Sequence, residues 1–77
     1  MMKFYFTYAL EGHPFSGGWT EVIARNFGEA IGKFREKHPD KIKGRLNCAY
    51  VSDAETFESS RAYTFGNFGK GCQEVIE

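Results

Sequence analysis

The sequence predicts an α+β fold: a two-layer sandwich in which a mostly antiparallel sheet of four to five strands packs against one main helix. Two observations support this class. Residues 3–10 alternate between apolar and less apolar positions, as a half-buried strand does, and residues 26–38 carry one apolar stripe at helical spacing. Seventy-seven residues form one domain, 1–77. The predicted order is strand, strand, helix, strand, short helix, strand, strand.

The first two strands are predicted at residues 3–10 and 19–25. In the first strand, one face is strongly apolar and consists of Phe4, Phe6, Tyr8 and Leu10. In the second strand, Thr20, Val22 and Ala24 share a face. Pro14 and the glycine pair Gly17 and Gly18 lie between the two strands, so we expect a hairpin with an extended loop.

The main helix is predicted to begin after Asn26, whose side chain can accept a hydrogen bond from the first turn. Glu29 follows three residues later and completes a capping-box pattern. Pro39 disfavours helical geometry at His38, so the helix should end near that residue. The buried stripe is predicted to consist of Phe27, Ala30, Ile31, Phe34 and His38.

Two glycines, Gly28 and Gly32, interrupt this helix four residues apart and therefore share a face. Each costs about 1 kcal/mol relative to alanine in a helix interior. Two interpretations stay open: packing compensates for the weak propensity, or another backbone approaches closely at this face.

The last part of the chain alternates short apolar runs with turn residues. Ser52 and Glu55 repeat the cap pattern and predict a helical turn or two after residue 52. The predicted elements are a strand at 45–51, a short helix at 53–58, a strand at 61–65, a glycine-rich turn at 66–71 and a strand at 72–76.

The charges balance, with ten Lys and Arg against ten Asp and Glu. A net charge of zero argues against a protein that acts on nucleic acid through its overall field. No apolar run has the length of a membrane span. The first ten residues alternate like a strand rather than forming the apolar stretch of a signal peptide, so we expect a cytoplasmic location and no membrane association.

One segment is nevertheless basic. Residues 33–45 carry six of the ten cations against Glu36 and Asp40. Such a patch could contact phosphates or the acidic face of a protein, whereas the alternative is a solvated helix end whose cations complement the helix dipole. The candidate binding residues in this segment are Lys37, Lys41, Lys43 and Arg45.

Aromatic residues in or beside the loops form a second candidate contact surface. Phe15 lies in the first loop, Trp19 directly follows it, and Phe68 lies in the glycine-rich turn. They can anchor a partner, or they can fold back over a small core. We include Phe15 and Trp19 among the candidate binding residues.

Catalytic, cofactor and metal sites have little support. The GNFGKG run lacks the spacing of a phosphate-binding loop and of the RNA-recognition signature, and no nucleophile motif is present. Three interpretations stay open for Cys48 and Cys72: free buried thiols, a disulfide, or a metal site with His13 and His38. We expect no catalytic residue, no cofactor and no enzymatic activity.

Four segments spread over most of the chain resemble a type of small protein carried by bacteriophages and prophages: GGWTEV, FREKHPD, LNCAYV and GNFGKGCQEVI. The resemblance implies an origin in a mobile element and a cytoplasmic, binding-type role. It carries over no functional residue and no assigned activity.

The sequence therefore favours a small non-enzymatic binding module with a macromolecular partner, most directly a protein. One alternative is a nucleic-acid-binding protein that uses residues 33–45. Another is a structural homodimer that pairs through an open sheet edge and has no ligand site.

Overall fold

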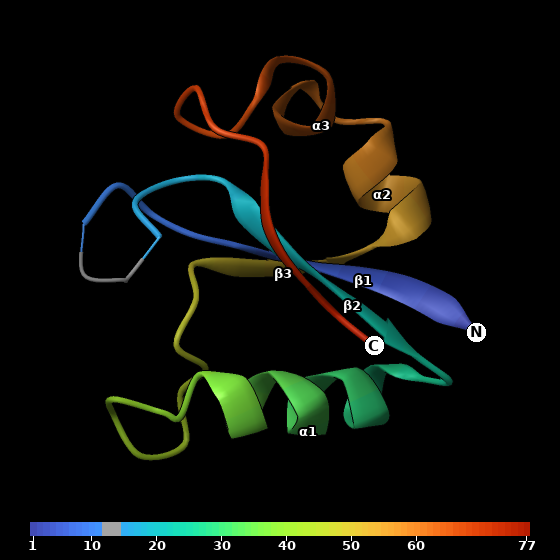
Figure 1. Cartoon of the computed structure of the whole chain (residues 1–77), viewed down its shortest axis with the longest axis vertical. Helices are drawn as coiled ribbons and strands as arrows, with labels where there is room; N and C mark the ends of the chain where they lie inside the picture. The colour runs from blue at the N-terminus through green and yellow to red at the C-terminus, as the bar shows by residue number, and fades with distance from the viewer. Residues whose placement is uncertain (12–14) are drawn as a thin grey trace.

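The structure is a computed structural model, and it describes residues 1–11 and 15–77. Its centre is a four-stranded mixed sheet in the order β3-β1-β2-β4 (Figure 1). The strands are β1 (Met2–Thr7), β2 (Trp19–Ala24), β3 (Tyr50–Asp53) and β4 (Cys72–Ile76). β1 runs antiparallel to β2 and to β3, whereas β2 and β4 are parallel. The predicted α+β class is confirmed.

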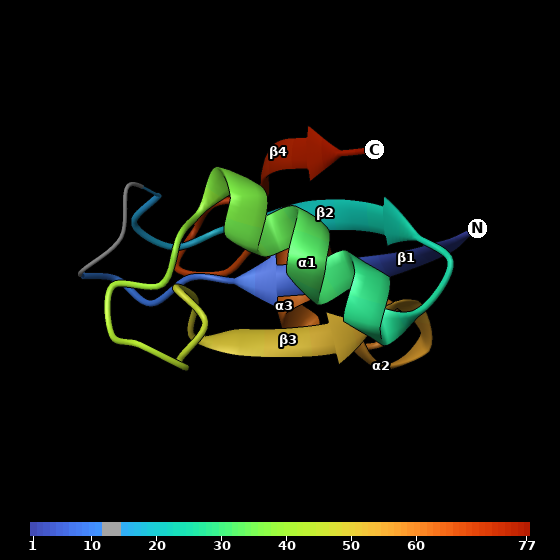
Figure 2. The same ribbon diagram turned by 90° about the horizontal axis from the view of Figure 1, so that it is seen from below.

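Three helices cover the two faces of this sheet. The main helix α1 (Phe27–Lys37) lies across one face, and the short helices α2 (Ala54–Glu58) and α3 (Arg61–Phe65) lie on the other (Figures 1 and 2). The predicted helical layer is thus α1, and the short helices add a partial layer opposite to it. None of the helices in the described part of the chain is long and apolar enough to cross a membrane.

The larger core lies between α1 and the sheet. The rings of Phe6 and Phe34 stack in it with their centroids 4.2 Å apart. Its buried members are Phe4, Phe6, Tyr8, Val22, Ala24, Ala30, Phe34 and Ile76. The alternation of the first two strands predicted most of this face. Leu10, however, is exposed, because β1 ends at Thr7 and the chain has left the sheet before that residue.

A second, smaller core lies on the opposite face. Tyr5 stacks on Phe57 of α2 with the ring centroids 4.4 Å apart, and Trp19 meets both rings edge-on. These three residues are buried. The short helices therefore exist because the sheet has aromatic residues on both faces, and each face needs a cover.

The N-terminus of α1 follows the prediction closely. The Asn26 side chain accepts a hydrogen bond from the Glu29 amide at 2.8 Å. The Glu29 carboxylate accepts from the backbone amide of Arg25 rather than from that of Asn26.

Phe27 was predicted to be buried but is 49% exposed, because its ring meets Phe4 edge-on and its other side faces solvent.

Residues 61–65 were predicted to form a strand, and this prediction was wrong: they form helix α3. The Ser60 side chain caps the helix by accepting from the Tyr63 amide, and Gly66 ends it with a positive φ of 93°. The weak alternation of Tyr63 and Phe65 resembled a strand, but as part of a helix Tyr63 packs edge-on against Tyr5 and Phe57 of the smaller core.

Two other boundaries differ from the prediction. Asp53 rather than Ser52 caps α2, because its carboxylate accepts from the Thr56 amide at 2.8 Å. The predicted strand 45–51 pairs with β1 from Tyr50 onward. Before that, residues 42–45 form a tight turn in which the Arg45 amide donates to the Ile42 carbonyl at 2.9 Å.

The glycine-rich segment 66–71 forms the predicted turn and packs on the sheet. Asn67 and Lys70 pair across the two central residues, Phe68 and Gly69, which both have positive φ. The Asn67 side-chain amide donates to the carbonyl oxygens of Tyr8 and Gly18, each at 2.8 Å. This one side chain therefore ties the turn to the loop end of the β1–β2 hairpin.

Candidate functional site

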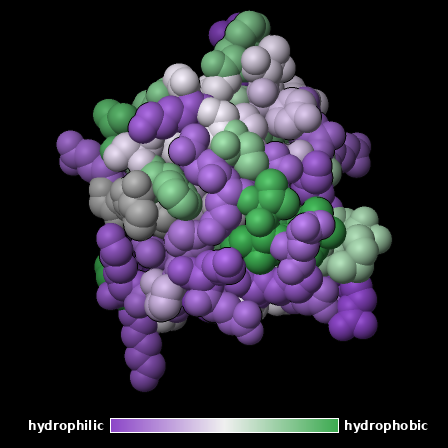
Figure 3. Space-filling view, viewed as in Figure 1, coloured by the Kyte–Doolittle hydropathy of each residue, from purple (hydrophilic) through white to green (hydrophobic). Residues whose placement is uncertain are grey.

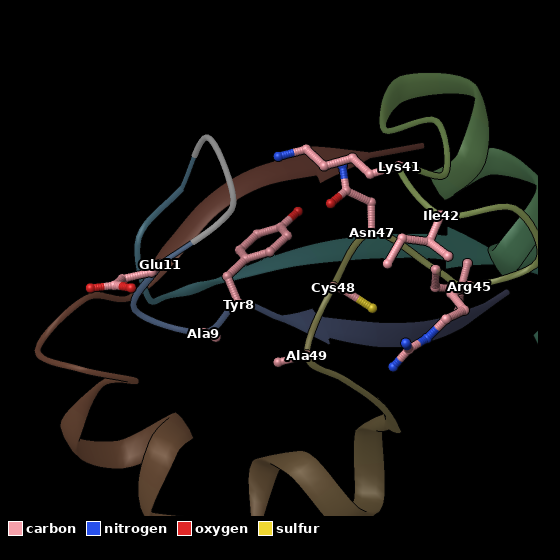
Figure 4. Close-up of a pocket in the computed structure, with 10 residues that line it drawn as sticks. Tyr8, Ala9, Glu11, Lys41, Ile42, Arg45, Asn47, Cys48 and Ala49 are labelled. Atoms are coloured by element: carbon pink, nitrogen blue, oxygen red, sulfur yellow. The ribbon is translucent and has the colours of Figure 1, made fainter.

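The best-defined pocket lies where the chain returns from α1 toward β3, beside the residues that follow β1. It encloses about 270 Å³. Figure 4 shows the phenol of Tyr8 reaching into this region, below the amine of Lys41 and near the amide of Asn47. The lining residues are Tyr8, Ala9, Glu11, Lys41, Ile42, Arg45, Leu46, Asn47, Cys48 and Ala49. A pocket with apolar walls and a few polar groups is the usual form of a binding site.

Behind the pocket, four polar side chains from four parts of the fold form one hydrogen-bonded chain. The hydroxyl groups of Tyr8 and Thr20 share a short hydrogen bond. Thr20 then donates to Glu74 Oε1 at 3.1 Å, and His38 Nε2 lies 2.7 Å from the same oxygen. Tyr8, Thr20 and His38 are all buried. We call these four residues the Glu74 cluster.

The electrostatics of the cluster favour a structural role for Tyr8. Burial raises the pKa of the Tyr8 phenol well above its usual value, although the hydrogen bond with Thr20 acts in the opposite direction. The phenol therefore stays protonated at neutral pH and remains a hydrogen-bond donor. It fixes the wall of the pocket rather than titrating there.

The two aromatic candidates do not form an exposed contact surface. Phe15 is half-buried and packs against Tyr8 and His38, with ring centroids 5.4 Å and 5.7 Å away. Trp19 is only 5% exposed and belongs to the smaller core. Trp19 was expected to contact a partner, and its burial corrects that expectation: it begins β2, where its face is covered by α2.

The basic segment divides into two groups. Lys33 donates to the Ile23 carbonyl at 2.8 Å, and Arg35 forms an ion pair with Asp40 at 3.0 Å, so these two cations hold the fold together. The other four are exposed and lie on the last turn of α1 or in the loop after it: Lys37, Lys41, Lys43 and Arg45. We call residues 37–45 the basic loop.

Two of the predicted binding residues, Lys41 and Arg45, belong to the pocket. Both line it, although Figure 4 shows their side chains extending in different directions from its rim. Lys41 precedes the tight turn at residues 42–45, Arg45 ends it, and Lys43 lies within it. Lys37 and Lys43 do not line the pocket.

A second, more open groove of about 400 Å³ adjoins the pocket and runs between α1 and the start of β3. Ile31 and Arg35 of α1 form one side, and Tyr50 and Val51 of β3 form the other. The chain that separates the two depressions lines both of them, with Arg45, Leu46, Cys48 and Ala49. Arg45 therefore borders two adjacent concave surfaces.

Both cysteines are free thiols in this structure. Cys48 is half-buried, and its burial raises the pKa of the thiol to about 11. Cys72 is exposed on β4. Within residues 1–11 and 15–77, no three His, Cys, Asp or Glu side chains come together as a metal site would require. His13, which the sequence offered as a ligand, lies outside the described residues.

Sequence reasoning missed the residues that shape the site from behind. Thr20 and Glu74 looked like ordinary positions on short strands, yet both join the Glu74 cluster. Asn47 lies in the pocket wall and had no local signal. The one available hint was the position of Thr20 on the apolar face of β2, where a hydroxyl needs a buried partner.

The chain was also compared with known proteins. No family model, curated protein or solved structure matches it. The two concave surfaces and the residues around them are therefore the features of this chain that bear on its function.

Proposed function

We propose that this chain is a small non-enzymatic binding module of phage or prophage origin that binds an acidic surface of a protein partner. The observation that carries the proposal is the position of Lys41 and Arg45 on the rim of a pocket with apolar walls. Apolar walls exclude water from a contact, and rim cations select and steer a partner of opposite charge. The phage origin is supported by the four segments that resemble phage-carried proteins, and the proposal includes a cytoplasmic location.

The distribution of charge favours a protein partner over nucleic acid. Net charge is zero, so no long-range field draws the chain to a polyanion. Lys33 and Arg35 are held in contacts within the fold, which leaves four exposed cations near α1 rather than a continuous stripe. The pocket beside them offers apolar contact area that a phosphate backbone would not use.

The Glu74 cluster supports the non-enzymatic part of the proposal. Glu74 accepts from Thr20 and lies within hydrogen-bonding distance of His38, and burial keeps the phenol of Tyr8 protonated. These groups hold one another in place behind the pocket wall. A general base must instead direct its lone pair at a substrate proton.

The proposal can be tested by capture from a bacterial lysate with three forms of the tagged protein. They are the unmodified chain, the double variant Lys41→Glu/Arg45→Glu, and the matched control Arg61→Glu/Lys70→Glu, which changes the net charge equally at exposed positions far along the chain. The lysate is treated with nuclease. We expect the unmodified chain and the control to retain one stoichiometric protein and the double variant to lose most of it.

Two results would overturn the proposal. Equal capture by the double variant would show that the basic loop is not the contact surface. Salt-sensitive binding of DNA or RNA, abolished by the double variant, would instead establish the nucleic-acid alternative. Light scattering on the purified chain tests the homodimer alternative, because a stable dimer would double the 8.8 kDa mass of the chain.

A further inference from the structure

One edge of the sheet combines a strand whose outer side is open with a groove and an exposed cation, Arg45. β3 pairs with β1 on one side, and no other strand in the described part of the chain pairs with its outer edge. Figure 2 shows β3 at the border of the sheet, with α1 in front of the sheet and its N-terminal end near the end of β3. In an edge strand, alternate residues direct their amide and carbonyl groups outward, where another chain can bond to them.

The groove beside the start of β3 supplies side-chain contacts to go with this edge. Ile31, Leu46 and Val51 give it apolar surface, and Arg45 borders it. Arg35 also lines the groove, although Asp40 neutralises part of its charge. Tyr50, the first residue of β3, is 73% exposed at the same end of the strand. An extended segment beside β3 would therefore find apolar contacts and positive charge at one end.

The charge along β3 changes sign. Arg45 stands near its start, and Asp53 ends it. An added strand with an acidic residue near Arg45 and a neutral or basic residue near Asp53 would match this gradient. The opposite arrangement would place like charges together at both ends, which is unfavourable across paired strands.

The other open edge of the sheet, at β4, does not combine an apolar groove with positive charge. Glu74 lies within β4 and Glu77 follows it, so this edge is negative. Figure 3 shows a hydrophobic patch near the C-terminal end of β4 on an otherwise largely hydrophilic face, and Val75 is exposed there. Nothing along β4 would favour an acidic strand over any other.

We infer that β3 accepts an extended acidic segment of the partner protein as an added strand, with one acidic side chain beside Arg45. This inference rests on the proposed function and names its mode of recognition. Main-chain hydrogen bonds to the outer edge of β3 provide affinity. The groove provides specificity by binding those side chains of the added strand that point toward α1. β3 is only four residues long, so the added strand is short and depends on the groove for specificity.

A random linear peptide library, displayed on phage and selected against the full chain at low salt, tests this mode directly. We expect the enriched peptides to alternate apolar and polar residues and to carry an acidic residue at one end. The best peptide is then synthesised and added to ¹⁵N-labelled protein. We expect the largest amide shifts at residues 50–53 and 31–35, and contacts between peptide amides and those of β3.

Two variants check the role of the charge. Arg45→Glu should weaken the selected peptide at least about tenfold, because a close opposite-charge contact becomes a repulsion. Lys70→Glu makes the same change of charge on a different turn and should leave the affinity within about twofold. Circular dichroism confirms that both variants are folded.

The results separate this inference from the proposed function. Selected peptides that shift the amides of β4, or that bind as helices, would overturn strand addition at β3. Failure to select any peptide, while lysate capture still depends on Lys41 and Arg45, would overturn strand addition and leave the binding module intact. If the peptide selection and the lysate capture both fail, strand addition at β3 and the proposed binding function are both overturned.

Discussion

The side chains of His38 and Glu74 meet at 2.7 Å although 36 residues separate them in the chain. The same oxygen of Glu74 accepts from Thr20 at 3.1 Å. One carboxylate on an edge strand therefore fastens the end of α1, the central strand β2 and β4 to one another. The arrangement fixes the base of the loop that carries Lys41 and Arg45, and it explains how a small fold positions a pocket wall.

Removal of that carboxylate should destabilise the fold. Glu74→Ala leaves the buried donors of Thr20 and His38 without their acceptor, and we expect the free energy of unfolding to fall by about 1–3 kcal/mol. Glu74→Gln keeps an oxygen in place and should cost less. Urea denaturation measures both, with Glu77→Ala as a control on the same strand end. Equal stability of all three variants would show that the cluster contributes nothing.

Replacement of Phe68 by asparagine should stabilise the fold, because asparagine suits the backbone of this turn better than phenylalanine does. The φ of Phe68, 52°, lies in the left-handed region, which a bulky side chain adopts at a cost, and its side chain is 61% exposed. Phe68 and Gly69 are the two central residues of a turn that favours Asn-Gly. We expect Phe68→Asn to raise the free energy of unfolding by about 0.5–1 kcal/mol in urea denaturation.

The control for this variant is Phe65→Asn. Phe65 is also exposed but belongs to α3 and has no positive φ. It should therefore show no gain in stability. A loss of stability in Phe68→Asn would mean that the buried part of the ring contributes more than the backbone strain costs.

Gly32 should tolerate alanine with a gain in stability. Apart from its chain neighbours and the adjacent backbone of α1, no atom of the described residues lies within 4 Å of the Cβ that alanine would add there, so no close approach by another segment explains this glycine. We expect Gly32→Ala to stabilise the chain by about 1 kcal/mol through helix propensity. Thermal unfolding measures the change. If the variant is more stable but captures less partner, the partner approaches α1 at this face.

Gly18→Ala provides the opposite case. Its φ is 71°, and the added Cβ would lie 2.6 Å from the Gly71 carbonyl oxygen. We expect a clear loss of stability, because backbone rather than a flexible side chain must move. A neutral result at Gly18 would contradict the close packing between the hairpin and the turn at residues 66–71.

The sequence predicted those parts of the fold that local patterns determine. The alternation of the first strand gave the buried face of Phe4, Phe6 and Tyr8, and Asn26 marked the start of α1. Residues 61–65 were misassigned because two aromatic residues at alternate positions resemble a strand, whereas the Ser60 cap and the packing of Tyr63 on the smaller core favour a helix. Neither the aromatic alternation nor the Ser60 cap could show which parts of the fold residues 61–65 would pack against.

The candidate site was predictable only in part, and for a similar reason. An excess of cations in residues 33–45 is visible in the sequence, and it identified Lys41 and Arg45. Whether a given cation is available for binding depends on its neighbours in space. The Ile23 carbonyl accepts from Lys33, and Asp40 forms an ion pair with Arg35. The contacts of Glu74 join segments far apart in the chain, and no short-range pattern encodes them.

Glu21 should make the fold sensitive to acid. Burial opposes its ionisation, but hydrogen bonds from Trp19, Cys72 and Lys3 outweigh that effect, so the pKa of Glu21 lies below its ordinary value. A carboxyl group with a lowered pKa in the folded state stabilises the fold above its unfolded pKa. That stability is lost as pH falls through the folded pKa.

We therefore expect the unmodified chain to lose stability below about pH 4.5, the ordinary value for this group, and Glu21→Gln to lose less over the same range. Fluorescence of Trp19 reports the change, since its indole donates to Glu21 at 3.2 Å. Parallel acid curves for the two proteins would show that other carboxyl groups control the transition.

The two thiols should react at different rates. Cys72 is exposed, whereas Cys48 is half-buried between the pocket and the groove, where burial raises the pKa of its thiol to about 11. Because the thiolate is the reactive form, iodoacetamide at pH 8 should modify Cys72 first, although burial also raises the pKa of the Cys72 thiol. Mass spectrometry of intact protein and of peptides measures the order of labelling.

The variant Cys72→Ser isolates the slower thiol. In this variant, the reaction of Cys48 with iodoacetamide should accelerate as pH rises toward 11. At pH 8 it should be fast only in urea, where the fold no longer buries Cys48. A selected peptide bound in the groove should slow it further, because Cys48 lines that groove. Labelling of Cys48 at the same rate in native buffer and in urea would contradict its burial and the enclosed pocket wall to which it belongs.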